Sequence, residues 1–174
     1  VILYLGDNGF IFGEHGLIDK RCAYDESIRI PMLMRYPKSL KPGTKVEKIV
    51  ANIDVAPTLL EVAGLKSKER MDGESFWQLA KGKGSSDWRK YLLYEYYWER
   101  NYPQTPTNHA VIGEDYKYIR YHGVWDQDEL YHTKSDPKER KNLFNDSSQK
   151  SRITEMNRAL FDLLADSSGE NMPL

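Results

Sequence analysis

The sequence lacks the features that define several common classes of protein. It has one cysteine, Cys22, so an intramolecular disulfide and a zinc site built from several cysteines are both excluded. Its 25 lysines and arginines nearly balance its 26 aspartates and glutamates, and this balance does not indicate a nucleic-acid or membrane-surface partner. No apolar run approaches the roughly 20 residues that a transmembrane helix requires.

The chain opens on an apolar run, residues 1–5 (VILYL), which no methionine precedes. The run has no positively charged segment before it and leads into a polar motif, so it is not a signal peptide. Because every position is apolar, it predicts a strand buried on both faces, as in a parallel sheet covered by helices. A buried strand at the first residue suggests that the chain has lost what preceded it. The alternative is a natural small domain numbered after processing.

The first half of the chain, residues 1–85, predicts an α/β unit. Pro31 cannot donate to a β-ladder and should lie near the start of its strand. Asp54 fits the N-cap of a helix, and Gly64 fits its stop. Residues 9–27 have no sustained period and predict a long loop of the kind that often carries function. The predicted elements are a strand over residues 28–36, a helix over 55–63 and a short helix over 75–80.

The second half, residues 86–174, follows a linker-like stretch and predicts a small α+β unit. Short segments rich in tyrosine and β-branched residues alternate with turns, which is typical of an antiparallel sheet. These segments are residues 91–98, 109–113, 116–121 and 129–132. One apolar face of a C-terminal helix then follows, formed by Ile153, Met156, Leu160, Leu163 and Leu164. The predicted fold class is α/β, with this helix packed on the second sheet.

Asp7 and Asn8 stand between glycines directly after the predicted strand of residues 1–5. Ligands in open α/β sheets bind beyond the carboxyl ends of strands, and carboxylate and amide oxygens suit calcium or magnesium. The flanking glycines let the backbone turn sharply and approach a ligand closely. The same four residues also fit an ordinary turn at a strand end, so both interpretations stay open.

Lys20 lies thirteen residues after Asp7, in the predicted loop, and His15 lies between them. A lysine beside a metal can bind an anionic group and stabilise charge that develops on it. A solvated surface lysine is the ordinary alternative. His15 fits a metal ligand, a substrate contact or a plain loop histidine.

Residues 6–37 (GDNGFIFGEHGLIDKRCAYDESIRIPMLMRYP) resemble a segment of the sulfatases of the alkaline-phosphatase superfamily. The shared features are the Asp-Asn pair, the GEHG element and the lysine. The family's Tyr-Glu-x-x-x-Arg-x-Pro stretch corresponds here to residues 24–31 (YDESIRIP). His132 departs from the family pattern, which usually has aspartate there, at a position that we interpret as structural. The resemblance covers nearly the whole chain and continues in residues 53–60 (IDVAPTLL), 71–75 (MDGES), 116–119 (YKYI) and 129–137 (ELYHTKSDP).

This resemblance implies a fold, a cofactor and a set of site residues. The first half would be part of an alkaline-phosphatase-like core sheet. Asp7 and Asn8 would be ligands of the metal, usually calcium with magnesium as the alternative. Lys20 would contact the sulfate as the catalytic residue of this chain. His15, near the pocket mouth, and His109 would be substrate contacts.

The resemblance also implies that the nucleophile lies outside this chain. Sulfatases convert a cysteine or serine within C/S-x-P-S-R to formylglycine, and Cys22 is followed by a different pattern, so we interpret it as a small buried or loop residue. The two earlier aspartate ligands also have no counterpart here. We therefore expect the missing N-terminal part of the protein to be a partner, and the fragment alone to be inactive. Glu26 and Arg29 would brace the loop.

Two other functions stay open at this point. One is a phosphonate monoester hydrolase or phosphodiesterase of the same superfamily. The other is a non-catalytic binding domain, which the bare strand at residue 1 disfavours, because such a strand needs neighbours. Asn8 and the tail motif of residues 129–137 favour a sulfatase. By family resemblance the protein would be periplasmic, secreted or lysosomal.

The expected partner is a sulfated small molecule or a sulfated saccharide. Residues 94–98, Trp125 and the loop of residues 102–109 supply aromatic side chains that can form a wall for a sugar ring. The alternative is that these aromatics pack between the small sheet and its helix.

Overall fold

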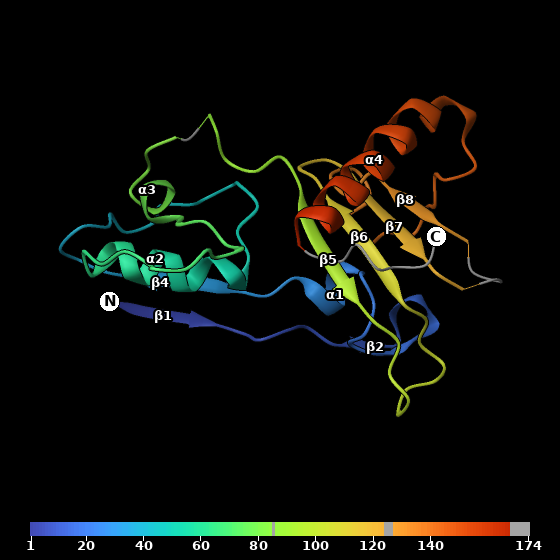
Figure 1. Cartoon of the computed structure of the whole chain (residues 1–174), viewed down its shortest axis with the longest axis horizontal. Coiled ribbons are helices and arrows are strands. Elements are labelled where there is room, and N and C mark those ends of the chain that lie inside the picture. Colours follow the sequence, from blue (N-terminus) through green and yellow to red (C-terminus); the bar gives the residue numbers. More distant parts are fainter. Residues whose placement is uncertain (85, 124–126, 168–174) are drawn as a thin grey trace. The chain divides into compact units, whose positions relative to one another are not determined.

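The computed structural model describes residues 1–84, 86–123 and 127–167, and the chain divides into two compact units (Figure 1). Unit 1 consists of Val1–Asp7 and Pro31–Arg89, and unit 2 consists of Asn8–Ile30 and Lys90–Leu174. The domain boundary expected after residue 85 lies close to the boundary in the structure, where unit 1 ends at Arg89 and unit 2 continues from Lys90. Residues 8–30 differ from the expectation, because they pack with the C-terminal sheet and not with the first α/β part.

Unit 1 is a two-stranded sheet with helical layers packed on it. Its elements are β1 (Ile2–Leu5), β4 (Met32–Arg35), η2 (Asn52–Asp54), α2 (Val55–Val62) and α3 (Trp77–Ala80). The two strands pair antiparallel, with Tyr4 opposite Leu33. Met34 packs against a buried cluster that includes Trp77 of α3. The helix predicted over residues 55–63 ends as expected, because Gly64 adopts a left-handed backbone with φ 73°.

The expectation that residues 1–5 are buried on both faces is wrong for this chain. Ile2 is 60% exposed, Tyr4 is 65% exposed, and Leu33 of β4 is 65% exposed. Side chains of a strand alternate between the two faces, so these three residues lie on one face of the sheet. The helical layer covers the opposite face, which carries Met34, and the described residues place nothing over the first.

The strand predicted over residues 28–36 is shorter than expected. Residues 25–28 form the helical turn α1 (Asp25–Ile28), in which the Ile28 N–H donates to the Tyr24 carbonyl at 3.1 Å. β4 begins only after Pro31, since the ring of a proline cannot donate to the ladder.

Asp54 precedes α2 as predicted, but its carboxylate does not cap that helix. The side chain is fully buried and binds the chain at three places. It accepts from the backbone N–H of Ala51 at 2.8 Å and of Glu74 at 2.9 Å, and it pairs with Arg89. The carboxylate therefore holds the loops of unit 1 together.

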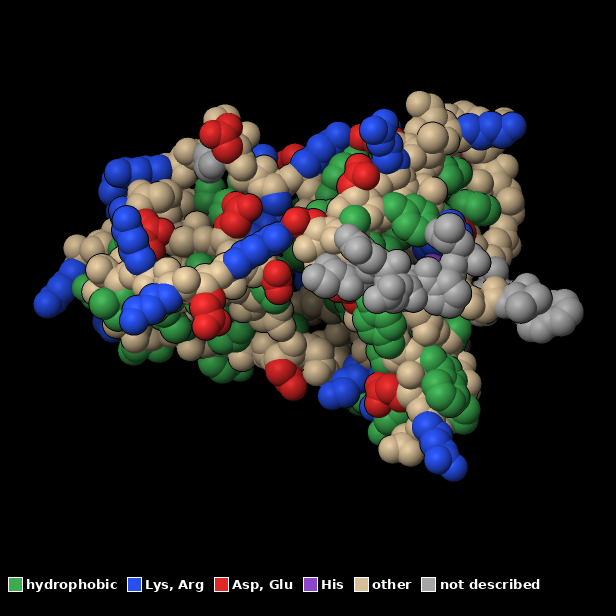
Figure 2. All heavy atoms as spheres, viewed as in Figure 1, with side chains coloured by type: hydrophobic (Ala, Val, Ile, Leu, Met, Phe, Trp, Pro, Cys, Tyr) green, Lys and Arg blue, Asp and Glu red, His purple; other side chains and the backbone are tan. Residues whose placement is uncertain are grey.

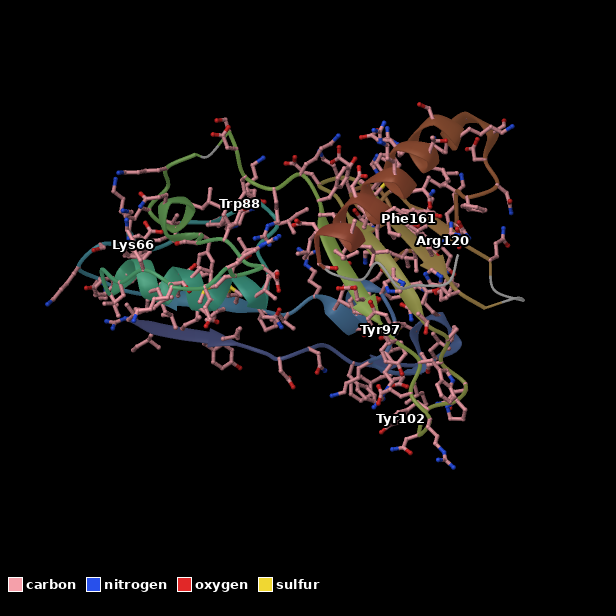
Figure 3. All side chains as sticks on the ribbon, in the orientation of Figure 1. Lys66, Trp88, Tyr97, Tyr102, Arg120 and Phe161 are labelled. Atoms are coloured by element: carbon pink, nitrogen blue, oxygen red, sulfur yellow. The ribbon has the colours of Figure 1, made fainter. Side chains whose placement is uncertain are left out.

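Unit 2 contains the predicted antiparallel sheet and the predicted helix. The sheet runs in the order β5 (Leu92–Tyr96), β6 (Asn108–Ile112), β7 (Lys117–Tyr121) and β8 (Glu129–Tyr131), and α4 (Lys150–Asp166) packs on it. Met156, Leu160 and Leu164 of α4 are buried against Val111 and Tyr118 of the sheet, which confirms the predicted apolar face. Arg120 of β7 also lies against the ring of Phe161 of α4, at 5.3 Å (Figure 3).

Residues 8–30 cover the other face of this sheet. They form β2 (Ile11–Phe12), η1 (Glu14–Gly16), β3 (Ile18–Asp19) and α1. Ile11, Cys22 and Tyr24 are buried in one cluster with Ala110 and Ile119, which alternate along β6 and β7 with the residues facing α4. Cys22 is thus a small buried residue as expected, and burial raises the pKa of its thiol.

The surface carries charges of both signs. Acidic and basic side chains are intermixed over the face seen in Figure 2, in keeping with a formal net charge of −1. Among the helices in the described ranges, none combines the length and the apolarity that crossing a lipid bilayer would require.

Candidate active-site edge

The structure brings Asn8 and Lys20 together. The Lys20 ammonium donates to the Asn8 side-chain carbonyl, with Nζ and Oδ1 3.2 Å apart, and both residues are exposed. The Asn8 amide donates in turn to the Gly9 carbonyl at 2.7 Å. Residues twelve apart in sequence meet because β2 and β3 form a hairpin, in which Ile11 pairs with Asp19.

Ser27 of α1 contacts both sides of this pair. Its hydroxyl donates to the Lys20 carbonyl at 2.6 Å, and its carbonyl accepts from the Gly9 N–H at 2.7 Å. Gly9 approaches α1 so closely that a Cβ there would lie 2.1 Å from the Glu26 carbonyl oxygen. The close approach that the sequence predicts for this glycine is therefore made to the protein's own backbone.

Asp7 and Asn8 offer oxygen donors of the kind that calcium and magnesium prefer. Asp7 is exposed and follows the last residue of β1 by two positions. Asn8 Oδ1 already faces a positive group, the Lys20 ammonium. The donor chemistry of these residues thus fits a hard divalent cation, and two side chains supply only part of the six to eight ligands that calcium takes.

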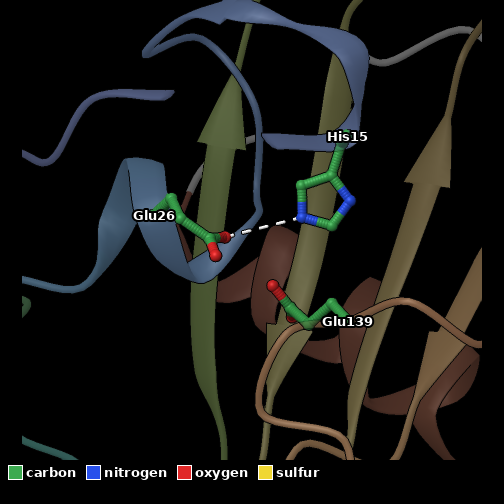
Figure 4. A group of neighbouring side chains, drawn as sticks. All are labelled: His15, Glu26 and Glu139. Atoms are coloured by element: carbon green, nitrogen blue, oxygen red, sulfur yellow. Dashed lines mark ion pairs between the residues drawn. The ribbon is translucent and has the colours of Figure 1, made fainter. Parts of the chain in front are cut away.

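His15 is turned into the fold of unit 2 and not toward Lys20. Its ring stacks on Tyr24 with centroids 3.8 Å apart, and its Nε2 lies 3.5 Å from a Glu26 carboxylate oxygen (Figure 4). Glu139 reaches the same place, and one ligand-type atom from each of these three side chains lies within 4.8 Å of the others. His15 also has a left-handed backbone, with φ 54°, which a non-glycine residue adopts at some cost.

The bracing role expected for Glu26 agrees with its contacts. Glu26 pairs with His15 and, at 3.3 Å, with the Lys138 ammonium, so it ties the hairpin to the turn that follows β8. Arg29 contributes less, because its side chain is 78% exposed and lies 3.4 Å from Asp25.

A buried group of charges, formed by Lys117, Glu139 and Asp25, anchors α1. The sequence alone did not identify it. The Lys117 side chain is completely buried, and its ammonium contacts the Ala23 carbonyl at 2.9 Å, a Glu139 oxygen at 2.6 Å and Asp25. Glu139 also accepts from the Asp25 N–H at 2.7 Å. Burial raises the pKa of the Glu139 carboxyl, and the Lys117 charge opposes that shift. The YKYI motif contained this lysine, but no local signal marks its distant partners.

His109 lies on the face of the sheet that α4 covers, so the structure does not bring it together with Asn8 and Lys20. It is completely buried, and its Nδ1 is 2.9 Å from Nε2 of His122. Burial, together with the neighbouring His122, lowers the pKa of His109 to about 4. The imidazole is therefore neutral near pH 7, and its ring meets the edge of Tyr97 with centroids 5.3 Å apart.

Strand β5 and the segment between β5 and β6 carry the aromatic side chains proposed for a sugar wall, and the structure divides them. Tyr94 packs into the sheet core, whereas Tyr97 and Trp98 are 47% and 53% exposed. Tyr97 and Tyr102 both lie on this segment (Figure 3), and the Arg21 guanidinium stacks 3.1 Å from the Tyr102 ring centroid. The segment is thus anchored to the residue next to Lys20. Trp125 lies outside the described residues.

Residues 13–166 match the family described as N-sulphoglucosamine sulphohydrolase, C-terminal. The chain belongs to this sulfatase family. The resemblance predicted from the motifs is thereby confirmed, and so is the α/β fold class with its C-terminal sheet and helix.

Two known proteins resemble this chain over most of its length. A Bacteroides thetaiotaomicron protein described as N-acetylglucosamine-6-O-sulfatase is 38% identical over 149 residues. A solved structure in complex with its substrate D-glucosamine-2-N,6-O-disulfate matches with a TM-score of 0.90 at 32% identity, over 98% of this chain. The first match includes 83% of this chain but only 26% of the relative. The match to the solved structure likewise includes only 35% of that chain.

The fold alone does not separate sulfatases from their superfamily neighbours. The phosphonate monoester hydrolase of Agrobacterium radiobacter matches with a TM-score of 0.80 over 95% of this chain and 35% of that chain, at 22% identity. This likeness shows a shared fold, while the family match and the 38% identical relative assign the chain to the sulfatases.

Proposed function

We propose that the protein containing this chain hydrolyses a sulfate ester of a saccharide, and that Lys20 contacts the sulfate. The observation that carries this proposal is the 3.2 Å contact between the Lys20 ammonium and Asn8 Oδ1. It joins an anion-binding cation to an oxygen donor suited to a divalent metal, as hydrolysis of an anionic ester requires.

Asp7 and Asn8 would hold calcium, or magnesium, which when bound would offset charge on the sulfate oxygens. Lys20 would donate to a sulfate oxygen and stabilise the charge that develops during ester cleavage. The C/S-x-P-S-R motif does not occur in these 174 residues. The formylglycine nucleophile and the remaining metal ligands would therefore come from another part of the protein, and this chain alone is expected to be inactive.

The proposed substrate class is a sulfated amino sugar. Two matched proteins are described with N-acetylglucosamine or glucosamine sulfate, and the exposed Tyr97 and Trp98 offer faces for a sugar ring. His109 supports this segment through the Tyr97 ring. A substrate contact by His15 would require its ring to leave Tyr24 and Glu26, so we assign it first to holding the hairpin. We also propose the periplasm, the extracellular space or the lysosome as the compartment.

The test is Lys20→Ala in the full-length enzyme, with N-acetylglucosamine 6-sulfate as the substrate and released sulfate as the readout. Loss of a cation that faces developing charge can cost about 3 kcal/mol, so kcat should fall roughly a hundredfold. Lys38→Ala, at an exposed lysine of unit 1, is the matched control and should leave kcat unchanged.

Two outcomes would contradict the proposal. One is unchanged turnover by a folded Lys20→Ala enzyme, which would return this lysine to the class of surface lysines. The other is a wild-type enzyme that cleaves an aryl phosphonate monoester with a higher kcat/KM than any sulfate ester. That result would favour a phosphonate monoester hydrolase or phosphodiesterase of this superfamily.

A further inference from the structure

Ser27 bonds to the backbone at both residues of the proposed site in unit 2, at Lys20 itself and at Gly9, which follows Asn8. Its hydroxyl donates to the Lys20 carbonyl at 2.6 Å, and its own carbonyl accepts from the Gly9 N–H at 2.7 Å. Ser27 is 1% exposed, so water does not compete for either bond. Both bonds act on the backbone, and they leave the Lys20 and Asn8 side chains free to face a ligand.

The support beneath Ser27 is built from distant parts of the chain. Asp25 is the first residue of α1. Its backbone N–H donates to the Glu139 carboxylate at 2.7 Å, and its side-chain carboxylate accepts from the Lys117 ammonium. Glu139 lies 114 residues away in sequence and has a left-handed backbone with φ 49°. A strained residue that reaches a buried ammonium costs free energy, and such features persist where the surroundings fix them in place.

The exposed state of Lys20 makes this support relevant to catalysis. An exposed lysine has many rotamers, and a misplacement of about 1 Å can cost on the order of a hundredfold in rate. The Ser27 hydroxyl bond fixes where the Lys20 side chain starts, and the hairpin of β2 and β3 fixes its direction. Without that bond the end of β3 keeps its two ladder pairs and the contacts of Arg21 with Asp19 and Tyr102, but the Lys20 carbonyl loses its bond to the Ser27 hydroxyl.

We infer that Ser27 is a positioning residue that sets the Lys20 ammonium against Asn8 and thereby against the sulfate. This inference rests on the proposed function, because it assigns Ser27 an effect through Lys20. The hydroxyl does not touch substrate. Its effect on turnover should therefore disappear when Lys20 is absent, whereas a general loss of folding would not depend on Lys20.

A double-mutant cycle in the full-length enzyme tests this directly, with N-acetylglucosamine 6-sulfate as the substrate. Ser27→Ala alone should lower kcat/KM about tenfold, the equivalent of about 1.4 kcal/mol, at a temperature where the variant stays folded. In the Lys20→Ala background the same change should have no further effect, since the group that it positions is gone.

Thr58→Val in unit 1 is the matched control. Thr58 is also 1% exposed, and its hydroxyl donates to the Asp54 carbonyl at 2.6 Å, the same length as the Ser27 bond. This control should lower thermal stability without a Lys20-dependent change in kcat/KM.

The outcomes separate the inference from the proposed function. If Lys20→Ala leaves turnover unchanged, the proposed function fails, and the inference fails with it. If Lys20→Ala lowers turnover but Ser27→Ala lowers it equally in both backgrounds, or in neither, Ser27 is merely structural. If Ser27→Ala does not fold, Ser27→Cys, which keeps a small group with a weaker donor, takes its place in the cycle.

Discussion

The two units of this chain bury their sheets differently. In unit 2 the four-stranded sheet is covered on both faces, by α4 on one and by residues 8–30 on the other. In unit 1 the pair of β1 and β4 is covered on the face of Met34, while Tyr4 and Leu33 on the other face are 65% exposed. The described residues of unit 2 therefore bury both faces of its sheet. Those of unit 1 leave one apolar face of its sheet exposed.

The difference also shows how the proposed site is supported. Asn8 and Lys20 belong to unit 2. Helix α1, whose Ser27 bonds to Lys20 and Gly9, is anchored by the buried charges around Lys117. Asp7 belongs to unit 1 and follows the partly covered strand β1. Precise side-chain placement requires a rigid support, and only the Asn8–Lys20 side has one within the described residues.

The largest expected effect is on the buried charges of unit 2. Lys117→Met leaves Glu139 and Asp25 without their shared ammonium, and removing one partner of a buried ion pair costs about 3–5 kcal/mol. Urea unfolding should show this loss, and hydrogen exchange should show it in the amides of β6 and β7 while the amides of α2 keep their protection.

Lys134→Met is the matched control for this change. Lys134 is 73% exposed and pairs with Asp115 at 3.2 Å, so its loss should cost less than about 1 kcal/mol. Adding Glu139→Gln to Lys117→Met should recover part of the stability, because it removes an uncompensated buried charge. A loss below about 1 kcal/mol for Lys117→Met would show that the group does not hold unit 2 together.

A smaller effect is expected from pH, again in unit 2. The pKa of His109 is lowered from 6.5 to about 4 by burial, so the folded state favours the neutral ring. The stability that the neutral His109 ring contributes is fully present above pH 6.5. It is lost as the pH falls from 6.5 to about 4. One pKa unit corresponds to about 1.4 kcal/mol, so up to roughly 3 kcal/mol is at stake.

The measurement is the free energy of unfolding at a series of pH values between 7 and 4. The His109→Gln variant should lose most of the steep decline, because it has no ring to protonate. His132→Gln, at a half-buried histidine that meets Tyr116, should keep that decline. An identical pH profile for wild type and His109→Gln would refute the assignment of this decline to His109.

The same comparison explains which predictions from sequence succeeded. The short tyrosine-rich strands and the face of α4 were predictable, because unit 2 satisfies its own hydrophobic pattern. The family resemblance assigned Asn8 and Lys20 to one site, and in the structure the hairpin of β2 and β3 brings the two side chains together. Both residues belong to a motif that is recognisable in the sequence alone, and their role in a site stays a prediction.

The failures share a physical cause. The all-apolar run of residues 1–5 predicts burial on both faces, but a pattern states what a strand requires and not whether the chain provides it. Asp54 precedes a helix at the position of an N-cap. Its carboxylate instead accepts from the Glu74 backbone N–H and pairs with the Arg89 side chain, and both partners are distant in sequence. Glu139 and Lys117 also act across long separations in sequence, which local propensity does not encode.

The smallest expected effect tests the exposed face of unit 1. Leu33 and Met34 are neighbours on β4 and point to opposite faces, so the same substitution at each compares an open face with a covered one. Leu33→Thr should change the free energy of unfolding by less than about 0.5 kcal/mol, because its side chain already contacts water. Met34→Thr should cost about 1–2 kcal/mol, because Met34 packs against the cluster around Trp77. Urea unfolding of the 174-residue chain measures both. If Leu33→Thr cost as much as Met34→Thr, some part of the protein would have to cover this face in solution, and the contrast between the two units would be lost.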